Sequence, residues 1–243
     1  MDKAIHSVAP YFDPQGVRDE LSDIFRAHGD PLQARPEVLE RLKALVASAR
    51  QAARAGLESD GNGRRCAAGI SQFQDELIRV LYDYTIWHVY RATNPSDAER
   101  MAIVATGGYG RGLLAPWSDI DLLFLLPYKQ TPWGESVAEY ILYILWDLGF
   151  KVGHATRTVA QCVKLGAADI TICTSLLDAR LIHGDDLVVA ALLEAGAELR
   201  VAVYQARVQE RGADRDVGCA ELDAPRARTR HVPDTHALVP QYV

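Results

Sequence analysis

The sequence predicts a mixed fold of helices and strands, α/β in the broad sense and α+β in the narrower one. A small mixed β-sheet is packed with helices and preceded by an N-terminal helical layer. Two apolar runs predict the sheet, one at residues 101–106 and one that carries Asp119 and Asp121 and runs to residue 126, separated by a glycine-rich segment. Helical periodicity on both sides of these runs predicts the surrounding helices. With 243 residues, 49% of them hydrophobic, the chain can bury one core and an accessory helical layer.

The N-terminal helical region is assigned to residues 1–90. Its first 35 residues hold scattered proline, glycine and charge, and we expect a loosely ordered lead-in there. A helix is predicted at residues 36–55, with proline at its first position and Gly56 as its stop. Ser71 and Gln74 then form a capping-box pattern that predicts the start of another helix. The core-facing stripe of that helix is predicted to be Leu77, Val80, Leu81, Tyr84 and Trp87.

The core region is assigned to residues 91–200. A helix is predicted at residues 135–148, ended by Gly149, and a third strand at residues 151–157.

Two short helices and a turn are predicted after the third strand. Thr158 with Gln161 repeats the capping-box pattern, and Asp169 is expected to cap a second short helix. Residues 183–186 contain histidine, glycine and two aspartates, and we interpret them as a turn and a helix cap.

Two acids, Asp119 and Asp121, stand at i and i+2 where the second strand begins. Side chains alternate faces along a strand, so both acids project to one side while Ile120 and Leu122 project to the other. Two carboxylates so close repel one another unless a cation lies between them, and their hard oxygen ligands suit Mg2+ shared with substrate phosphates. A structural ion pair would instead need a basic neighbour on the same face.

The glycines Gly107, Gly108, Gly110 and Gly112 precede these acids and allow backbone N–H groups to approach an anion closely. Alone, they are equally typical of a tight turn. The P-loop pattern fails because Leu113 follows the last glycine where lysine is needed, and the dinucleotide pattern fails because no full crossover helix precedes the next strand. Together, the glycine turn and the acidic strand predict metal-dependent chemistry on a nucleoside triphosphate.

This combination resembles a known family. The segment Gly107-Gly-Tyr-Gly-Arg-Gly, followed by Ser118-Asp-Ile-Asp-Leu-Leu, is similar to the signature of the nucleotidyltransferase superfamily typified by DNA polymerase β. The flanks, from about residue 64 to residue 186, resemble more narrowly the N-terminal domain of the bacterial PII uridylyltransferase family. The resemblance implies a nucleotidyltransferase fold for the core region.

The same resemblance implies an activity and its cofactor. The expected reaction is transfer of UMP from UTP to a tyrosine hydroxyl of the PII signalling protein, with release of pyrophosphate. Two Mg2+ ions are expected, both held by Asp119 and Asp121, one binding the triphosphate and one lowering the pKa of the attacking hydroxyl.

The phosphate contacts implied by the resemblance come from four residues. Gly107, Gly108 and Ser118 would cradle the β- and γ-phosphates. Arg111 would be a charge partner for the triphosphate, since a guanidinium suits phosphate bidentately; the alternative is a solvated turn arginine.

A third carboxylate is usual in the superfamily, and here its position is open. The third predicted strand contains no acid. Asp178 is the nearest candidate for a catalytic acid, and the alternatives for it are an ion pair with Arg180 or a cap at the start of a strand. His154 would act as a base or merely pack.

Composition bears on the partner and the location. The net charge is −6 and no dense basic run precedes the tail, which favours a protein or small-molecule acceptor over nucleic acid. The four cysteines are widely spaced and are expected to be reduced thiols of a cytoplasmic protein, and we expect neither a secretory signal nor a membrane span.

Residues 201–243 have an atypical composition without Ile, Phe, Trp, Lys, Ser or Asn, and we expect a poorly ordered tail. No His-Asp dipeptide occurs, so we do not expect the family's hydrolase and ligand-sensing domains. We expect instead a truncated form that lacks the uridylyl-removing half. Two alternatives to PII uridylylation stay open: nucleotidylation of a small molecule or another protein, and a catalytically silent nucleotide-binding fragment.

Overall fold

A computed structural model describes residues 10–92, 100–127, 129–184, 188–192 and 194. The chain divides into two units, Met1–Val201 and Ala202–Val243, and every described residue lies in the first. The predicted tail at residues 201–243 lies outside the described residues.

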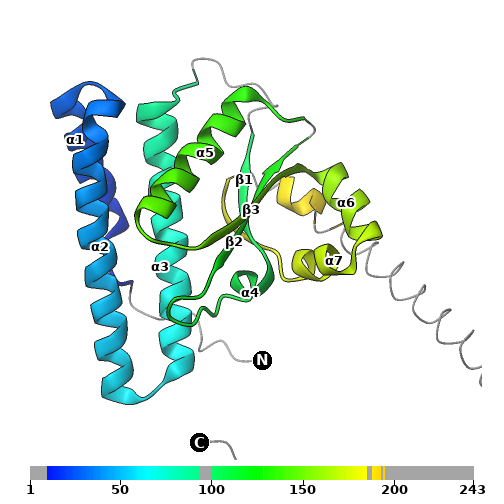
Figure 1. Ribbon diagram of the computed structural model, residues 1–243, viewed down its shortest axis with the longest axis horizontal. Coiled ribbons are helices and arrows are strands. Elements are labelled where there is room, and N and C mark those ends of the chain that lie inside the picture. Colours follow the sequence, from blue (N-terminus) through cyan, green and yellow to red (C-terminus); the bar gives the residue numbers. More distant parts are fainter. Residues whose placement is uncertain (1–9, 93–99, 128, 185–187, 193, 195–243) are drawn as a thin grey trace, which may run out of the picture. The chain divides into compact units, whose positions relative to one another are not determined.

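Three helices form a layer beside the sheet (Figure 1). Each contacts the other two, and the third also contacts the sheet through β4. The layer places a long amphipathic helix directly behind the strands. These helices are α1 (Pro14–His28), α2 (Pro31–Asp60) and α3 (Gly63–Tyr84).

The expected loose lead-in is wrong where the structure describes it, because α1 occupies much of that segment. Asp13 caps this helix, its side chain accepting a hydrogen bond from the Gln15 backbone N–H at 3.1 Å. Val17 and Leu21 are buried on the side that faces the other helices. A good cap and an apolar stripe therefore outweigh the glycine and proline content that suggested disorder.

The predicted bounds of the next helix, residues 36–55, are also wrong, because α2 begins at Pro31 and continues past Gly56. Asp30 caps the start, its side chain accepting from two backbone N–H groups. Pro36 lies inside the helix at the cost of one backbone hydrogen bond. The helix ends before Gly61, whose φ of 64° is left-handed.

The third helix begins eight residues before the predicted capping box. Asn62 caps α3, so Ser71 and Gln74 are buried residues within the helix and not its start. Four residues of the predicted stripe are buried, but Trp87 is 54% exposed. It lies in the π-helical turn Thr85–Val89, whose wider period changes the face that a residue presents.

The predicted mixed sheet is confirmed and has four strands in the order β3-β2-β1-β4. The first strand pairs antiparallel with both of its neighbours, and the second and third strands are parallel. Helix α5 (Pro132–Asp147) connects the parallel pair. The strands are β1 (Ala102–Ala105), β2 (Ile120–Leu126), β3 (Val152–Thr158) and β4 (Arg180–Gly184).

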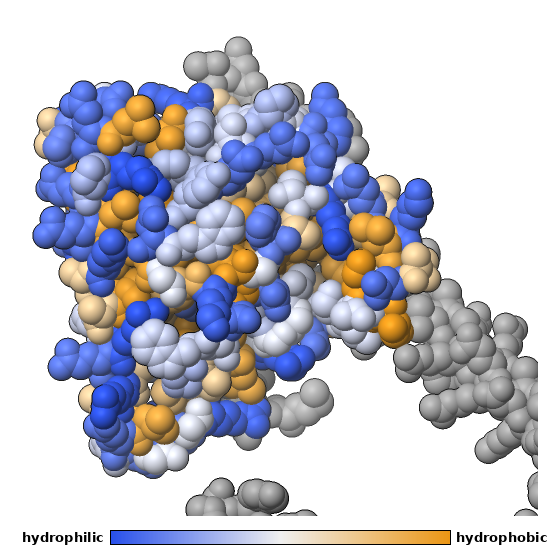
Figure 2. Space-filling model, viewed as in Figure 1, coloured by the Kyte–Doolittle hydropathy of each residue, from blue (hydrophilic) through white to orange (hydrophobic). Residues whose placement is uncertain are grey.

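Each face of the sheet has its own core. Ile120, Leu122 and Phe124 of β2 pack toward α3 and α5, whereas Leu123 and Leu125 pack on the opposite face, which α6 and α7 cover (Figure 1). Figure 2 shows apolar side chains on the outer surface of α6 and α7 as well. These exposed residues are Leu165, Ile170 and Leu177.

The capping predictions for α6 (Val159–Ala168) and α7 (Ile170–Leu177) are confirmed. Thr158 and Gln161 form a reciprocal capping box, and Asp169 caps α7. The predicted turn at residues 183–186 is wrong in its described part, because His183 and Gly184 belong to β4 and pair with β1.

Candidate active site

The two predicted metal ligands lie at the start of β2 on one face. Asp119 and Asp121 are exposed, while Ile120 and Leu122 are buried, so burial alternates as predicted. Within the described residues, no lysine, arginine or histidine forms an ion pair with either acid. The pair therefore has the exposure and the free lone pairs that an external cation needs.

Two glycines make room for the Asp121 carboxylate. Gly107 has a left-handed φ of 55°, and a Cβ added there would lie 3.1 Å from Asp121 Oδ2. Gly153 pairs with Asp121 across β2 and β3, and a Cβ on it would overlap Asp121 Oδ1. A glycine on each side lets both carboxylate oxygens face open space instead of neighbouring side chains.

The predicted glycine turn folds as a single helical turn, α4 (Gly107–Gly110), directly after β1. The Thr106 backbone N–H donates to the Asp121 backbone carbonyl at 3.0 Å, which fixes the turn beside the acidic strand. Gly110 contacts the backbone of Asp178 so closely that any side chain on it would overlap that carbonyl. The geometry therefore brings Gly107 next to Asp121, with Gly108 following it in the same turn.

A buried network, which was not among the predictions from the sequence, holds this turn from behind. Asp75 of α3 accepts a hydrogen bond from Tyr109 Oη at 2.6 Å and two from the Arg180 guanidinium, at 2.6 and 3.1 Å. Arg180 also donates to the backbone carbonyl of Gly110 at 3.3 Å. Burial raises the pKa of Tyr109 well above its ordinary value, so the phenol stays protonated and remains a donor.

One sequence signal for this network existed. Asp75 occupies the same helical stripe as Ser71, Ile78 and Tyr82, all of them buried, and a carboxylate on an apolar stripe needs a partner. The identity of that partner could not be read from the sequence, because Arg180 lies 105 residues away. Gly153 had a comparable signal, since a glycine inside a strand marks a close approach.

Arg111 and Asp178 form an ion pair with each other, Nη1 to Oδ2 at 2.7 Å. The alternative pairing of Asp178 with Arg180 is therefore wrong. Both partners of the observed pair are partly exposed, so it contributes at most about 1 kcal/mol. Arg111 can exchange such a weak partner for a phosphate oxygen at little cost, and its guanidinium lies over Gly108.

The remaining candidates are Ser118, which directly precedes Asp119, and His154 of β3. Ser118 is exposed, and its backbone N–H closes a turn onto the Ala115 carbonyl at 3.1 Å. His154 pairs with Leu122 in the sheet register and packs edge-on against Trp146, so it projects to the face opposite Asp121. Packing, rather than base chemistry, is the role that this position supports.

The residues present fit a magnesium site that relies on its substrate for ligands. Among the described side chains, no group of three or more His, Cys, Asp or Glu is close enough to hold an ion, so Asp178 does not join Asp119 and Asp121. Mg2+ usually binds one or two carboxylates and completes its shell with water and phosphate oxygens. Two exposed carboxylates beside a glycine turn meet that requirement.

Two further observations concern the whole described unit. Cys66, Cys162 and Cys173 are free and buried, and burial raises the pKa of Cys162 to about 11. None of the described helices is both long and apolar enough to cross a bilayer.

Comparison with known proteins agrees with the geometry. Residues 94–173 match the family described as nucleotidyltransferase domain. The chain is 50% identical over 184 residues to a bifunctional uridylyltransferase/uridylyl-removing enzyme of Rhodopseudomonas palustris, a match that covers 75% of this chain and 20% of the relative. The enzymes of the same name from Bradyrhizobium diazoefficiens and Phenylobacterium zucineum are 56% and 51% identical, over 66% and 73% of this chain and 17% and 19% of theirs.

This chain thus spans about a fifth of the length of the relatives it matches. The matched domain includes the glycine turn, both acids and Gly153, whereas Asp75 and Arg180 lie outside it. The protein therefore contains a nucleotidyltransferase domain and is related to the N-terminal region of bifunctional uridylyltransferase/uridylyl-removing enzymes.

Proposed function

We propose that this chain transfers UMP from UTP to a tyrosine hydroxyl of a PII signalling protein, with release of pyrophosphate. The observation that carries the proposal is the pair of exposed, unpaired carboxylates, Asp119 and Asp121, beside a glycine turn in a nucleotidyltransferase domain. The choice of UTP is supported by relatives that are named uridylyltransferases. The choice of PII follows from the family resemblance of the sequence.

The roles of the residues follow from their chemistry. Asp119 and Asp121 would hold two Mg2+ ions through their free oxygens. Magnesium, when bound, neutralises triphosphate charge and lowers the pKa of an attacking hydroxyl. The backbone N–H groups of Gly107 and Gly108 would donate to phosphate oxygens, and Ser118 would donate its hydroxyl.

Arg111 would leave Asp178 and bind the triphosphate. The exchange replaces a partly exposed carboxylate with a more highly charged partner, which is electrostatically favourable. A role for Asp178 as the third carboxylate would require this exchange to free it first, and its pairing with Arg111 favours a role as the charge partner of that arginine.

The net charge of −6 supports a protein acceptor in preference to nucleic acid. The buried free thiols support a reducing, cytoplasmic location.

The test is nucleotidyl transfer with purified protein. The chain is incubated with PII protein, Mg2+ and one α-labelled nucleoside triphosphate at a time, and label on PII is measured. We expect label from UTP only, lost with chelator and lost in Asp121→Asn. Asp23→Asn, an exposed acid on α1, is the matched control and should keep full activity.

Other outcomes have distinct meanings. Label on PII from a different nucleotide would contradict UTP as the donor. Pyrophosphate release without labelled PII would contradict PII as the acceptor, and UTP binding without any turnover would contradict transfer itself.

A further inference from the structure

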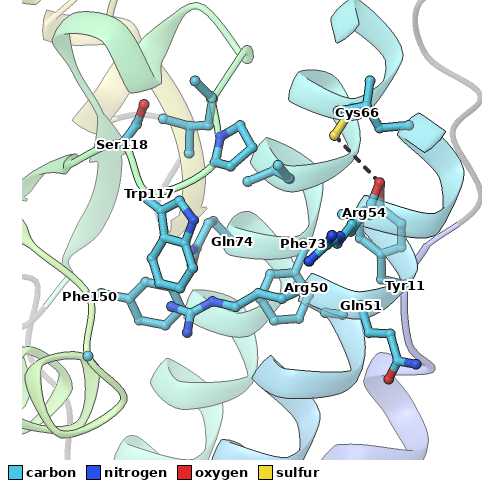
Figure 3. A pocket seen from close by; sticks show the side chains of 18 of the residues that line it. Tyr11, Arg50, Gln51, Arg54, Cys66, Phe73, Gln74, Trp117, Ser118 and Phe150 are labelled. Atoms are coloured by element: carbon cyan, nitrogen blue, oxygen red, sulfur yellow. Dashed lines mark hydrogen bonds between the residues drawn. The ribbon is translucent and has the colours of Figure 1, made fainter. Parts of the chain in front are cut away.

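A cavity of about 720 Å³ lies between α2, α3 and the segments at residues 114–118 and 149–151 (Figure 3). Its volume lies within the range typical of small-molecule sites, roughly 300–1,000 Å³. Asp119 and Asp121 do not line it, but Ser118 does. Four aromatic side chains contribute to the lining: Tyr11, Phe73, Trp117 and Phe150.

One lining side chain is a buried acceptor without a donor. Gln74 is only 5% exposed, and its Oε1 has no hydrogen-bond partner among the described residues. Leaving such a group unsatisfied costs about 1–3 kcal/mol. The neighbouring Asp75, on the same helix, is fully paired, whereas Gln74 lines the cavity. A ligand that brings an N–H group would satisfy the Gln74 acceptor.

The charge of the lining favours an anion. None of the described lining residues is acidic, whereas Arg50, Arg54 and Lys151 are basic. Arg54 is paired with Glu58, which lies outside the lining. In the described part of the chain neither Arg50 nor Lys151 has a carboxylate partner, so both are available to a ligand.

Arg50 is also positioned for a flat ligand. Its guanidinium lies 4.4 Å from the ring centre of Trp117 and 5.4 Å from that of Phe150 (Figure 3). Stacking orients the guanidinium plane while its N–H groups stay free to donate. The arrangement combines an aromatic surface with a fixed cationic donor.

Trp117 carries backbone strain at the mouth of this cavity. Its φ is 68°, a left-handed value at a residue that is not glycine, and its side chain is 76% exposed. Such a conformation costs about 1–3 kcal/mol and is typically found at ligand-binding positions. Pro116 before it fits a turn in which glycine is the usual third residue. The strained residue thus contributes an aromatic ring that stacks with Arg50 at the edge of the cavity.

We propose that the cavity binds a small aromatic anion that carries an N–H donor. Its ring would stack on the aromatic lining, its N–H would donate to Gln74 Oε1, and its anionic group would bind Arg50 and Lys151. Nucleotides and aromatic carboxylates share this chemistry. The ligand would contact the segment that ends at Ser118 and so hold the backbone from which Asp119 follows. The site is separate from the acidic pair and does not depend on the proposed reaction.

Anilinonaphthalene sulfonate tests this proposal, because it is an aromatic anion with an N–H donor and fluoresces when bound. Titrating the full folded chain should show one saturable site. Gln74→Leu and Arg50→Gln should each raise the Kd about tenfold, the loss of one hydrogen bond. Lys43→Gln, which removes a charge from α2 outside the lining, and Asp121→Asn should leave the Kd unchanged.

Thermal unfolding distinguishes binding from a merely structural role of Gln74. Gln74→Leu removes an unsatisfied acceptor, so its midpoint should stay equal or rise while affinity for the probe falls. If that variant does not fold, Ala115→Trp, which adds a ring at an exposed lining position, should abolish binding. The proposal would be overturned if the probe showed no saturable binding. It would also be overturned if Arg50→Gln and Ala115→Trp left the Kd unchanged.

Competition identifies the source of the ligand. Displacement of the probe by uridine monophosphate and not by indoleacetate would assign the cavity to nucleotides. The reverse result would assign it to aromatic carboxylates. Displacement by neither would contradict the ligand class.

Discussion

Asp75 and Asp121 lie on opposite sides of the glycine turn, and their surroundings differ completely. Asp75 is 7% exposed and accepts hydrogen bonds from Tyr109 and Arg180. Asp121 is exposed, has glycine on both sides and has no basic partner in the described residues. The fold thus separates two uses of a carboxylate. Asp75 is saturated with internal donors and holds the turn, while Asp121 is kept free for an external cation.

The largest expected effect is on the free acid. Asp121→Asn should lower turnover about a thousandfold, because it removes negative charge where positioning and charge neutralisation dominate phosphoryl transfer. The thermal midpoint should change little, since no internal partner is lost. Steady-state transfer and thermal unfolding are the measurements. Near-normal turnover would remove Asp121 from the metal site.

Asp75→Asn should have the opposite profile. It leaves the partly buried Arg180 without a counter-charge, and we expect a loss of roughly 3 kcal/mol in the free energy of unfolding. Urea unfolding at pH 7 measures this loss. Asp147→Asn, which breaks the exposed pair with Arg35, is the control and should cost less than about 1 kcal/mol. Equal losses in the two variants would contradict the structural role of the network.

Gly153→Ala tests whether the space around Asp121 matters. The added methyl would displace the carboxylate, and a displacement near 1 Å lowers turnover by about a hundredfold. Gly56→Ala, inside α2 where an added Cβ would meet only the Arg65 Nη2 at an ordinary contact distance of 3.9 Å, should keep full turnover and gain up to about 1 kcal/mol of stability. The measurement is the turnover number of nucleotidyl transfer, compared between the two variants. If Gly153→Ala is as active as the control, the glycine is not required for the site.

Asp178→Asn tests the third carboxylate. Because Asp178 already pairs with Arg111, we expect at most about a fivefold change in the KM for UTP and little change in kcat, in line with an exposed ion pair. A hundredfold fall in kcat would instead identify Asp178 as a catalytic acid that Arg111 releases during binding.

The smallest effect concerns Asp83, a second paired acid of α3. Burial alone would raise its pKa, but hydrogen bonds from His183 and Arg18 lower the pKa below its ordinary value. A lowered pKa contributes stability above the unfolded value, near pH 4, and loses it as the pH falls through the folded value. Stability measured from pH 6 to pH 3 should therefore decline less steeply in Asp83→Asn. An identical decline would contradict the pairing.

The local features were predictable because neighbours in sequence determine them. The alternation around Asp121, the strand before the glycine turn and the capping box at Thr158 depend on residues a few positions apart. The start of α2 was mispredicted for the same kind of reason: Pro36 is typical of a first turn, but Asp30 and Pro31 provide a better one.

The long-range features were not predictable from one sequence. The partner of Asp178 is Arg111 and not Arg180, because β4 places Arg180 against α3. Nothing in the local sequence records which arginine meets which acid across the sheet. For the same reason the cavity was not predictable, since its walls come from five separate segments of the chain.

The position of β4 in the sheet has a consequence for the order of folding. This strand follows all the other strands along the described chain, yet it pairs with β1 and carries the arginine that fastens the glycine turn. The helices α1 to α3 make mostly local contacts and can form early, whereas β4 must close a long loop first. A nascent chain would therefore have its scaffold before its phosphate-binding turn is held in place, and competence would arise only after Arg180 has been synthesised and docked.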